Sequence, residues 1–559
     1  MSAAPPRALQ EGQQHFLTGR FDAALDRLAE AVRLNPNDEV AHYSLGLTLG
    51  ALERGEAALA SYAAAIALRQ GFAAAHLARG NQLYELGRFD EALTSYDQFI
   101  ALKPDFAPAH NNRGNTLMRL GRPAEALASL ETALRLQTDY AQAHNNLADA
   151  LNALGRLEAA LASYDRAIAL QPDFAPAHGG RGAALGGLNR PAEALESFDR
   201  CIALSPAAPA AHRNRAAALY RLNRPHEAIQ SYRQAIALDQ NFAEARHELA
   251  LATLLTGDFD AGWRRFEDRK LVHPSFYKPF GETNAWLGER DLSGSSLLVY
   301  FEQGFGDTIQ FARFIEPLAA RCGKVFFLVQ PELAAMLGRN IKSAVVLTPE
   351  EALPAFDFQC ALMSLPLALG LGGEALASAR GYLRADQQRV ALWESRLAAR
   401  TRPRIGLVWS GAAHHQDDRN RSIGLQALAP LLSRDVDWIC LQTEARSGDA
   451  ERLRGADNLA FFGELLTDFD DTAALIEAVD LVISVDTAVA HLAGAMGKPV
   501  WVLLPFSPDW RWGPERADSA WYPSARLFRQ PTPGDWTGVV ERVGQVLDAP
   551  PRLGPGVSA

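Results

Sequence analysis

A histidine recurs every 34 residues through the first half of the chain, and this period limits the possible fold more than any other feature. The column consists of His42, His76, His110, His144, His178 and His212, and Arg246 holds the same phase one period later. A fixed period of this length indicates a solenoid of stacked units, in which each unit packs only on its neighbours. We therefore expect an α-solenoid in this half of the chain.

Three further columns keep the same phase. Small residues that let two helices approach closely form one column: Ala24, Ala58, Ala92, Ala126, Ala160, Ala194 and Ala228. Large side chains that fill the space between units form another: Leu28, Tyr62, Tyr96, Leu130, Tyr164, Phe198, Tyr232 and Phe266. Glycines form the third: Gly12, Gly46, Gly80, Gly114 and Gly182. Together these columns resemble a tetratricopeptide repeat array of about eight units over residues 5–276, whose last unit is degenerate, with Gly262 in the alanine column.

The repeated histidines do not predict a metal site, because residues one repeat apart are too distant to share an ion. Asparagines occupy one equivalent position near the middle of the first helix of three units, where we expect the concave face: Asn112, Asn146 and Asn214. They resemble the asparagine ladder of O-linked N-acetylglucosamine transferases, which implies a groove for an extended peptide. The ladder is incomplete, and solvated polar residues on a groove are the alternative.

Charge and composition exclude several classes of protein. A net charge of −10 and a pI near 5.8 argue against nucleic acid as the main partner. No apolar run approaches the roughly 20 residues that span a bilayer, and the start lacks the apolar core of a signal peptide. The four cysteines have no paired spacing: Cys201, Cys322, Cys360 and Cys440. We therefore expect a cytoplasmic protein without a disulfide framework or zinc cluster.

The second half predicts two α/β lobes, the first at residues 297–400 after a junction at 277–296. Residues 297–301 and 324–329 read as strands, and 308–321 as the helix between them. The turn before that helix contains Gln303, Gly304 and Gly306, whose glycines allow close approach to a ligand, and ends at Asp307. A carboxylate there could take a proton from a hydroxyl group. The alternative is that Asp307 is only a helix N-cap.

The second lobe covers residues 401–546, followed by a flexible tail at 547–559. Its first strand, 404–409, runs into a polar loop at 412–423 that holds Arg419 and Arg421. Arginines at this edge could bind a diphosphate. The alternative is that Asp417 and Asp418 pair with them on a solvated loop.

A further βαβ unit lies near the end of this lobe. Residues 481–485 form a buried strand, residues after Thr487 a helix that Gly497 ends, and 499–504 the next strand. The free amides at the helix start suit a phosphate, and Asp486, Thr487 and His491 would line that site. The alternative is that Asp486 is only an N-cap and His491 only a helix residue near the core.

Two motifs carry a resemblance to the glycosyltransferases of family 9, the heptosyltransferase group. They are Gly306-Asp307 in the first lobe, and Asp486-Thr487 with His491-Leu492-Ala493 and Gly497-x-Pro499 in the second. The resemblance implies a GT-B fold of two Rossmann-like lobes, with Asp307 as general base. It places the diphosphate on Asp486, Thr487 and one basic loop residue, Arg421 or Arg419, with His491 close by.

The same resemblance assigns further residues. It puts Trp409, Ser410 and Gly411 at the border of the pocket and Gln442 where the nucleobase is read. The aromatic and charged loop 504–513 either touches the donor or packs at the lobe interface.

The whole chain is thus expected to be α plus α/β, a tetratricopeptide α-solenoid followed by a GT-B lobe pair. The function expected is metal-independent, inverting transfer of a sugar from a nucleotide-sugar to a hydroxyl acceptor on a protein recruited by the repeats, with no cofactor. One alternative is a heptosyltransferase-like enzyme acting on a glycan or lipid-linked acceptor. Another is a non-catalytic scaffold whose lobes sense a sugar nucleotide. The base and sugar of the donor, the acceptor and the oligomeric state do not follow from the sequence.

Overall fold

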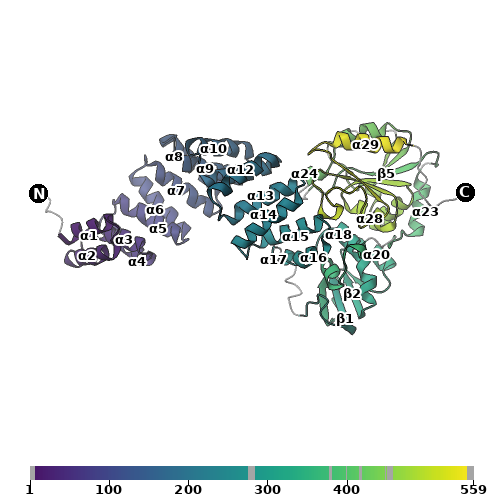
Figure 1. Cartoon of the computed structure of the whole chain (residues 1–559), viewed down its shortest axis with the longest axis horizontal. Coiled ribbons are helices and arrows are strands. Elements are labelled where there is room, and N and C mark those ends of the chain that lie inside the picture. Colours follow the sequence, from purple (N-terminus) through teal and green to yellow (C-terminus); the bar gives the residue numbers. More distant parts are fainter. Residues whose placement is uncertain are drawn as a thin grey trace. The chain divides into compact units, whose positions relative to one another are not determined.

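The computed structural model describes residues 7–272, 274, 284–376, 381–397, 399–413, 418–446, 448–449, 453 and 458–549. Residues 277–283 of the predicted junction and the tail from 550 onward lie outside this part of the chain. The chain divides into two compact units, Met1–Arg215 and Ala216–Ala559. The first unit consists of paired helices, and the second contains the last repeats together with two parallel sheets (Figure 1).

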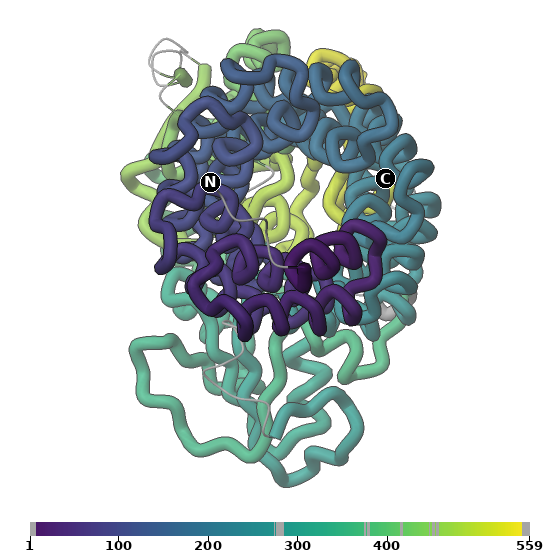
Figure 2. Tube along the Cα trace, turned by 90° about the vertical axis from the view of Figure 1, so that its left-hand side faces the viewer, coloured from purple at the N-terminus to yellow at the C-terminus, as the bar shows by residue number. Residues whose placement is uncertain are grey.

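The repeat helices confirm the predicted period. From α3 to α14 the helices alternate between 13 and 14 residues. In the first unit the pairs follow one another around a common axis (Figure 2). The helices of the repeats are α1 (Arg7–Leu17), α2 (Phe21–Leu34), α3 (Glu39–Ala51), α4 (Gly55–Leu68), α5 (Ala73–Glu85), α6 (Phe89–Leu102), α7 (Ala107–Arg119), α8 (Pro123–Leu136), α9 (Ala141–Ala153), α10 (Leu157–Leu170), α11 (Ala175–Gly187), α12 (Pro191–Leu204), α13 (Pro209–Arg221), α14 (Pro225–Leu238), α15 (Ala243–Leu255), α16 (Phe259–Phe266) and α17 (Arg269–Val272).

The histidine column has a local structural role. In each unit the imidazole Nε2 hydrogen-bonds the backbone carbonyl six residues earlier, at 2.7 to 3.0 Å. The carbonyls belong to Pro36, Gln70, Pro104, Thr138, Pro172 and Pro206. Each histidine therefore ties the first helix of its unit to the turn that precedes it, which gives a physical reason for the period.

The sheet of the first lobe has four parallel strands in the order β3-β2-β1-β4. The strands are β1 (Leu292–Tyr300), β2 (Cys322–Leu328), β3 (Val345–Leu347) and β4 (Phe358–Ala361). Val299 of β1 is paired with Phe327 on one side and Cys360 on the other, so β1 lies inside the sheet. Both strands predicted for this lobe are confirmed, although β1 begins five residues earlier than expected.

The single helix predicted at 308–321 is wrong. The segment divides into α18 (Phe305–Phe311), the 3₁₀ helix η3 (Ala312–Phe314) and α19 (Ile315–Ala319). Pro317 explains the division, because its ring carries no N–H to donate to the carbonyl of Arg313, four residues earlier. The other helices of this lobe are α20 (Pro331–Asn340), η4 (Leu362–Ser364), α21 (Leu365–Ala368), α22 (Gly373–Leu376) and α23 (Gln387–Arg396).

The sheet of the second lobe has six parallel strands in the order β10-β9-β8-β5-β6-β7. The strands are β5 (Arg404–Val408), β6 (Asp437–Cys440), β7 (Leu459–Phe461), β8 (Leu481–Val485), β9 (Val500–Leu504) and β10 (Ala525–Arg529). The helices are α24 (Asp418–Arg421), η5 (Leu425–Leu428), α25 (Ala429–Leu432), η6 (Gly463–Leu465), α27 (Phe469–Glu477), α28 (Ala488–Met496), η7 (Trp510–Trp512) and α29 (Trp536–Asp548). The predicted β8-α28-β9 unit is confirmed, and Gly497 ends α28 at a φ of 76°.

Burial of apolar side chains holds the lobes together. Val482, Ile483 and Val485 of β8 are fully buried, as expected for a central parallel strand. Cys201, Cys360 and Cys440 are buried thiols and Cys322 is half-buried, and none of these is in a disulfide. Over the described residues, no helix has both the length and the apolar character to cross a membrane.

Candidate functional site

Asp307 is the third residue of α18, the helix that follows the carboxyl end of β1. Gly304 is the N-cap of this helix, and Asp307 stands three positions later, where its Oδ2 accepts a hydrogen bond of 3.0 Å from the Gly304 N–H. The alternative that Asp307 is itself the N-cap is therefore wrong. The other oxygen, Oδ1, accepts a hydrogen bond from Nη2 of Arg511.

Arg511 belongs to the second lobe and brings the two lobes together at this carboxylate. Its Nε donates to Oε1 of Gln310 at 2.7 Å and its Nη1 to Oδ1 of Asp509 at 2.8 Å. Burial raises the pKa of Asp307 above its ordinary value, and the positive charge of Arg511 opposes that rise. Donors from both lobes therefore orient this carboxylate, and the charge of Arg511 favours its ionised form.

The side chain of Gln330 holds the loop before Asp307 in place. The side chain of Gln330 donates from Nε2 to the carbonyl oxygen of Gln303 at 2.9 Å and accepts from Thr308 Oγ1 at 2.8 Å. Gly306 lies against α28, since a Cβ at this position would stand 2.9 Å from Cδ2 of His491. A glycine is needed for this close approach between the lobes.

Asp486 and Thr487 connect β8 to α28. Thr487 is the N-cap, so the alternative that Asp486 fills this role is wrong. The hydroxyl of Thr487 lies 3.0 Å from the hydroxyl of Ser484. Burial, and after it the negative charge of Asp509, raises the pKa of Asp486 to about 6. This carboxyl group therefore changes charge close to neutral pH.

His491 faces Asp486 from the first turns of α28. Its Nε2 lies 3.7 Å from Oδ1 of Asp486, and its Nδ1 is 2.9 Å from the hydroxyl of Tyr522. The ring stacks on Trp512 with centroids 5.3 Å apart. Burial lowers the pKa of His491 well below its usual range, so the imidazole is neutral at pH 7. It is both a residue near the core and a neighbour of the site.

The structure separates the two arginines that the sequence left as alternatives. Arg421 is half-buried and donates from Nη1 to the backbone carbonyl of Asp486 at 3.2 Å, whereas Arg419 is exposed. Arg421 covers Gly411, where a Cβ would stand 2.5 Å from its Nη2, and its buried Nε has no hydrogen-bond partner among the residues that the structure describes. Arg421 is thus the arginine of this pair that lies beside Asp486.

One alternative was that Asp417 and Asp418 pair with Arg419 and Arg421. Asp418 instead contacts Ser422 and Arg446. Its carboxylate accepts from Ser422 Oγ at 2.6 Å and from Arg446 Nη2 at 2.5 Å. Asp417, with the rest of 414–417, lies outside the described residues.

Hydrogen bonds to Gln442 fix the backbone at Trp409 and Ser410, where β5 runs into the polar loop. Oε1 of Gln442 accepts from the backbone N–H groups of Trp409 and Ser410 at 2.7 and 3.1 Å, and its Nε2 donates to Ser410 Oγ at 3.1 Å. The indole of Trp409 is fully buried and donates to Asp449. Their side chains shape the backbone around Gly411, and the role of Gln442 in reading a base stays a prediction.

Arg511 and Asp509 are the members of the site that sequence reasoning did not single out. They stand in the loop 504–513, whose charged and aromatic residues were the available signal. The loop packs at the lobe interface, as one of the two alternatives for it predicted. The partner of Arg511 could not be read from the sequence, because Asp307 is 204 positions away.

The three asparagines of the predicted peptide groove make contacts within the array. Asn112 donates to Asn81 at 3.1 Å, and the buried Asn146 donates to Asn111 at 2.8 Å, so amides are linked across α5, α7 and α9. Asn214 accepts from Arg213. Their part in binding a peptide stays a prediction.

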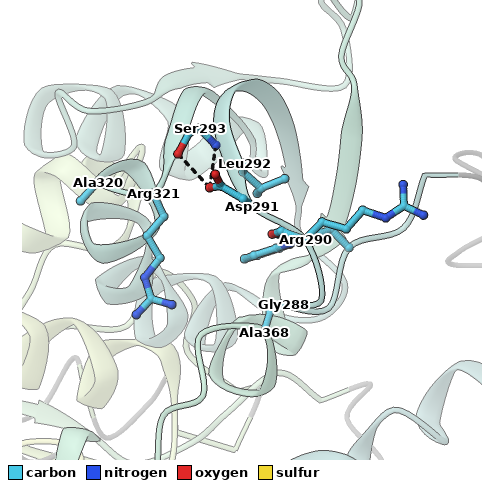
Figure 3. Close-up of a pocket in the computed structure, with 9 residues that line it drawn as sticks. Gly288, Arg290, Asp291, Leu292, Ser293, Ala320, Arg321 and Ala368 are labelled. Carbon is cyan, nitrogen blue, oxygen red and sulfur yellow. Dashed lines mark hydrogen bonds between the residues drawn. The ribbon is translucent and has the colours of Figure 1, made fainter.

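A separate pocket of about 370 Å³ lies at the other end of the first sheet (Figure 3). Leu292 and Ser293, at the amino end of β1, line it together with Arg321, while Asp307 follows the carboxyl end of the same strand. Ser293 donates to Asp291 from both its backbone N–H and its hydroxyl. This pocket is not part of the candidate site. Within the described ranges, no three His, Cys, Asp or Glu side chains form a group that could hold a metal ion.

Comparison with known proteins finds similarities in each half of the chain. Profiles of the tetratricopeptide repeat match residues 9–71, 80–121, 111–173 and 209–242. The profile of glycosyltransferase family 9 (heptosyltransferase) matches residues 439–526, which include Asp486, His491 and Arg511. The two parallel α/β sheets are consistent with the GT-B fold.

One curated relative is the protein FlbA of Caulobacter vibrioides, 28% identical over 338 residues. The match covers 54% of this chain and 55% of FlbA, so the chain spans about half the length of this relative.

Among solved structures, the repeats resemble YrrB, described as a TPR protein with an unusual peptide-binding site, at 23% identity. That match covers 33% of this chain and 95% of YrrB with a TM-score of 0.30. A thermophilic TPR protein of Thermus thermophilus is 29% identical, over 33% of this chain and 99% of its own, with a TM-score of 0.27. TM-scores this low carry no argument about function.

Proposed function

We propose that this chain, in which tetratricopeptide repeats precede a glycosyltransferase family 9 domain, transfers a sugar from a nucleotide-sugar to a hydroxyl group of a protein. The observation that carries the proposal is that α18, which holds Asp307, packs against α28 at Gly306 and His491, and that Arg511 lies within electrostatic reach of both Asp307 and Asp486. Arg421 and the start of α28 lie on the second-lobe side of this contact. One side supplies a base and the other supplies donors for a diphosphate, at the carboxyl ends of β1 and β8, where open α/β sheets bind ligands.

The proposed reaction is an inverting displacement without a metal. Asp307 takes the proton of the acceptor hydroxyl as that oxygen attacks the anomeric carbon. The bond from the anomeric carbon to the diphosphate oxygen breaks on the opposite face, and the nucleoside diphosphate leaves with the electron pair. A positioned carboxylate of this kind contributes typically about 10² to 10⁴ in rate.

The leaving diphosphate needs hydrogen-bond donors, and the second lobe offers them. In the described part of the chain, the buried Nε of Arg421 has no hydrogen-bond partner, and the free amides of α28 begin directly after Thr487. Donors fixed before the reaction stabilise developing charge at little reorganisation cost. This supports Arg421, Thr487 and the start of α28 as the diphosphate site, with His491 as a neutral neighbour.

The repeats support a protein acceptor, because solenoids of this type offer long surfaces for polypeptides. The free thiols fit our proposal of a cytoplasmic location. A glycan or lipid-linked acceptor is the second candidate, favoured by the match to heptosyltransferases. Screening peptides and oligosaccharides as acceptors separates the two.

A thermal-shift screen against UDP, GDP, ADP, CMP and their sugar conjugates tests the donor site. A ligand that binds only the folded protein raises its unfolding midpoint. We expect one nucleotide to stabilise the protein, Arg421→Ala to lose that effect and Arg419→Ala, on the exposed neighbour, to keep it. No stabilisation by any of these compounds would contradict the proposal and favour the scaffold alternative.

A further inference from the structure

The segment 505–514 joins the candidate site to the last repeats. Ser507 donates from its hydroxyl to the carbonyl of Tyr220 at 2.8 Å, and Asn223 donates to the carbonyl of Pro514 at 3.2 Å. Tyr220 and Asn223 lie at the end of α13 and in the turn after it. Both ends of the segment are therefore tied to the repeats that belong to the second unit.

The middle of the segment is held by aromatic rings. The indole of Trp510 meets Trp263 of α16 edge to face at 5.5 Å and lies 6.1 Å from the ring of Phe266. Trp521, from the second lobe, lies 5.9 Å from Trp510. Such pairs stabilise by about 0.5 to 1.5 kcal/mol beyond the area they bury. The terminal repeat thus fixes the residue immediately before Arg511.

Arg511 contacts the first lobe through two of its three guanidinium nitrogens. The side chain is 9% exposed, its Nε and Nη2 donate to Gln310 and Asp307 of α18, and Nη1 donates to Asp509 of its own segment. The guanidinium carbon lies 4.3 Å from the centre of the Trp510 ring. Arg511 is therefore fixed between the ring that the repeat holds and the helix that carries Asp307.

We propose that Arg511 is a positioning residue for Asp307 and that the terminal repeats hold it in place through Trp510. The inference rests on the proposed function, in which Asp307 is the base. It makes the last repeats part of the catalytic unit in addition to any role in recruiting an acceptor. It also means that the base is oriented only while the two lobes and the terminal repeat are packed together.

The charges around Asp307 show what Arg511 contributes. Arg511 is the cation in direct contact with it, whereas Asp509 from the same segment and Glu302 from the end of β1 are anions that oppose its ionisation. Asp486 and the neutral His491 face the same space from β8 and α28. Without Arg511 the carboxyl group would face anions on several sides. Loss of Arg511 would therefore favour the protonated form of Asp307, which cannot accept the proton of a hydroxyl group.

Titration of Asp307 in the full-length protein tests this inference without any substrate. A diazo reagent esterifies protonated carboxyl groups, and mass spectrometry of the Asp307 peptide measures labelling from about pH 4 to about pH 9. In Arg511→Met we expect the pH of half labelling to rise by about 1 to 3, the usual effect of losing an adjacent opposite charge. Arg511→Lys should restore most of the difference, and Trp510→Leu should raise the midpoint by less.

Arg516→Met is the matched control, because Arg516 pairs with the exposed Asp518 just beyond the segment. It should titrate as the unchanged protein does. Equal midpoints in Arg511→Met and the unchanged protein would overturn the inference, as would a loss of thermal stability in both Arg511 variants with no change in Asp307 labelling.

Turnover distinguishes this inference from the proposed function. When the protein consumes a nucleotide-sugar, the acid limb of the pH profile of kcat/KM can be measured. In Arg511→Met this limb should shift to higher pH by the same amount as the labelling midpoint, and a limb at the same pH as in the unchanged protein would count against the inference. Absence of turnover in the unchanged protein contradicts the proposed function, while the labelling result decides the Arg511 contact independently.

Discussion

Removing the guanidinium of Arg269 should destabilise the second unit strongly. Arg269 follows the last repeat in α17, and Glu302 stands between β1 and the loop of Gly304, with both side chains 1% exposed. Arg269 donates from Nε and Nη2 to the two oxygens of Glu302 at 2.8 and 2.9 Å, and from Nη2 to Ser364 at 2.8 Å. The backbone N–H of Met363 donates to the same carboxylate.

The size of the effect follows from leaving a buried charge without its partner. Breaking a buried ion pair from one side costs about 3 to 5 kcal/mol, because the remaining carboxylate keeps its desolvation penalty. For a unit of the size of Ala216–Ala559, at about 2.1 cal/mol/K per residue, Arg269→Met should lower the unfolding midpoint by about 4 to 7 °C. Differential scanning calorimetry of the full chain measures this transition.

Two further variants test whether the loss of stability comes from the buried charge. Arg269→Met with Glu302→Gln removes both charges and should be less destabilised than Arg269→Met alone. Arg402→Met breaks the exposed pair with Asp435 and should cost at most about 1 kcal/mol. A midpoint of Arg269→Met equal to that of Arg402→Met, or a double variant less stable than both single variants, would contradict a buried ion pair between Arg269 and Glu302.

Three other predictions concern pH and packing. Burial raises the pKa of Glu267, but Arg269 and Lys270 outweigh it and lower that pKa to about 2. The carboxylate therefore stabilises the fold above about pH 4.5 and loses this effect as the pH falls towards 2, so the midpoints of the unchanged protein and Glu267→Gln should converge in acid; a constant difference would refute this. Because the pKa of Asp486 is raised to about 6, its charge appears above that pH and repels a diphosphate. The affinity for the nucleoside diphosphate that stabilises the protein, measured by calorimetric titration, should fall as the pH rises through 6 relative to Asp486→Asn, and parallel profiles would contradict it. Gly306→Ala places a Cβ 2.9 Å from His491 and should cost about 1 to 3 kcal/mol, whereas Gly304→Ala, with 3.5 Å to its nearest neighbour, should be tolerated; equal calorimetric midpoints would show that the lobes yield.

The repeats and the strands could be predicted because each rests on local periodicity. The 34-residue phase of the histidines and alanines reflects contacts that recur in every unit. The apolar run 481–485 and Gly497 likewise gave β8 and the end of α28 nearly to the residue. In these segments the pattern of side chains and the fold follow the same period.

The rest depended on contacts between distant parts of the chain. Arg419 and Arg421 are the same residue type, two positions apart in one loop. Only the path of that loop in three dimensions decides that Arg421 reaches the carbonyl of Asp486. The pairing of Arg511 with Asp307 joins two lobes, and no local pattern encodes such a contact. Thr487 and Asp486 are both good N-caps, so the backbone at the strand end, with Thr487 extended, decided between them.

The most direct test of the central claim is the transfer reaction itself. The nucleotide-sugar that stabilises the protein is incubated with candidate protein acceptors, and the acceptor mass and the released nucleoside diphosphate are measured together. The account predicts that the acceptor gains the mass of one sugar for each nucleoside diphosphate released. Asp307→Asn should still bind the donor while turnover falls by about 10² to 10⁴. Turnover by Asp307→Asn at the rate of the unchanged protein would contradict the account.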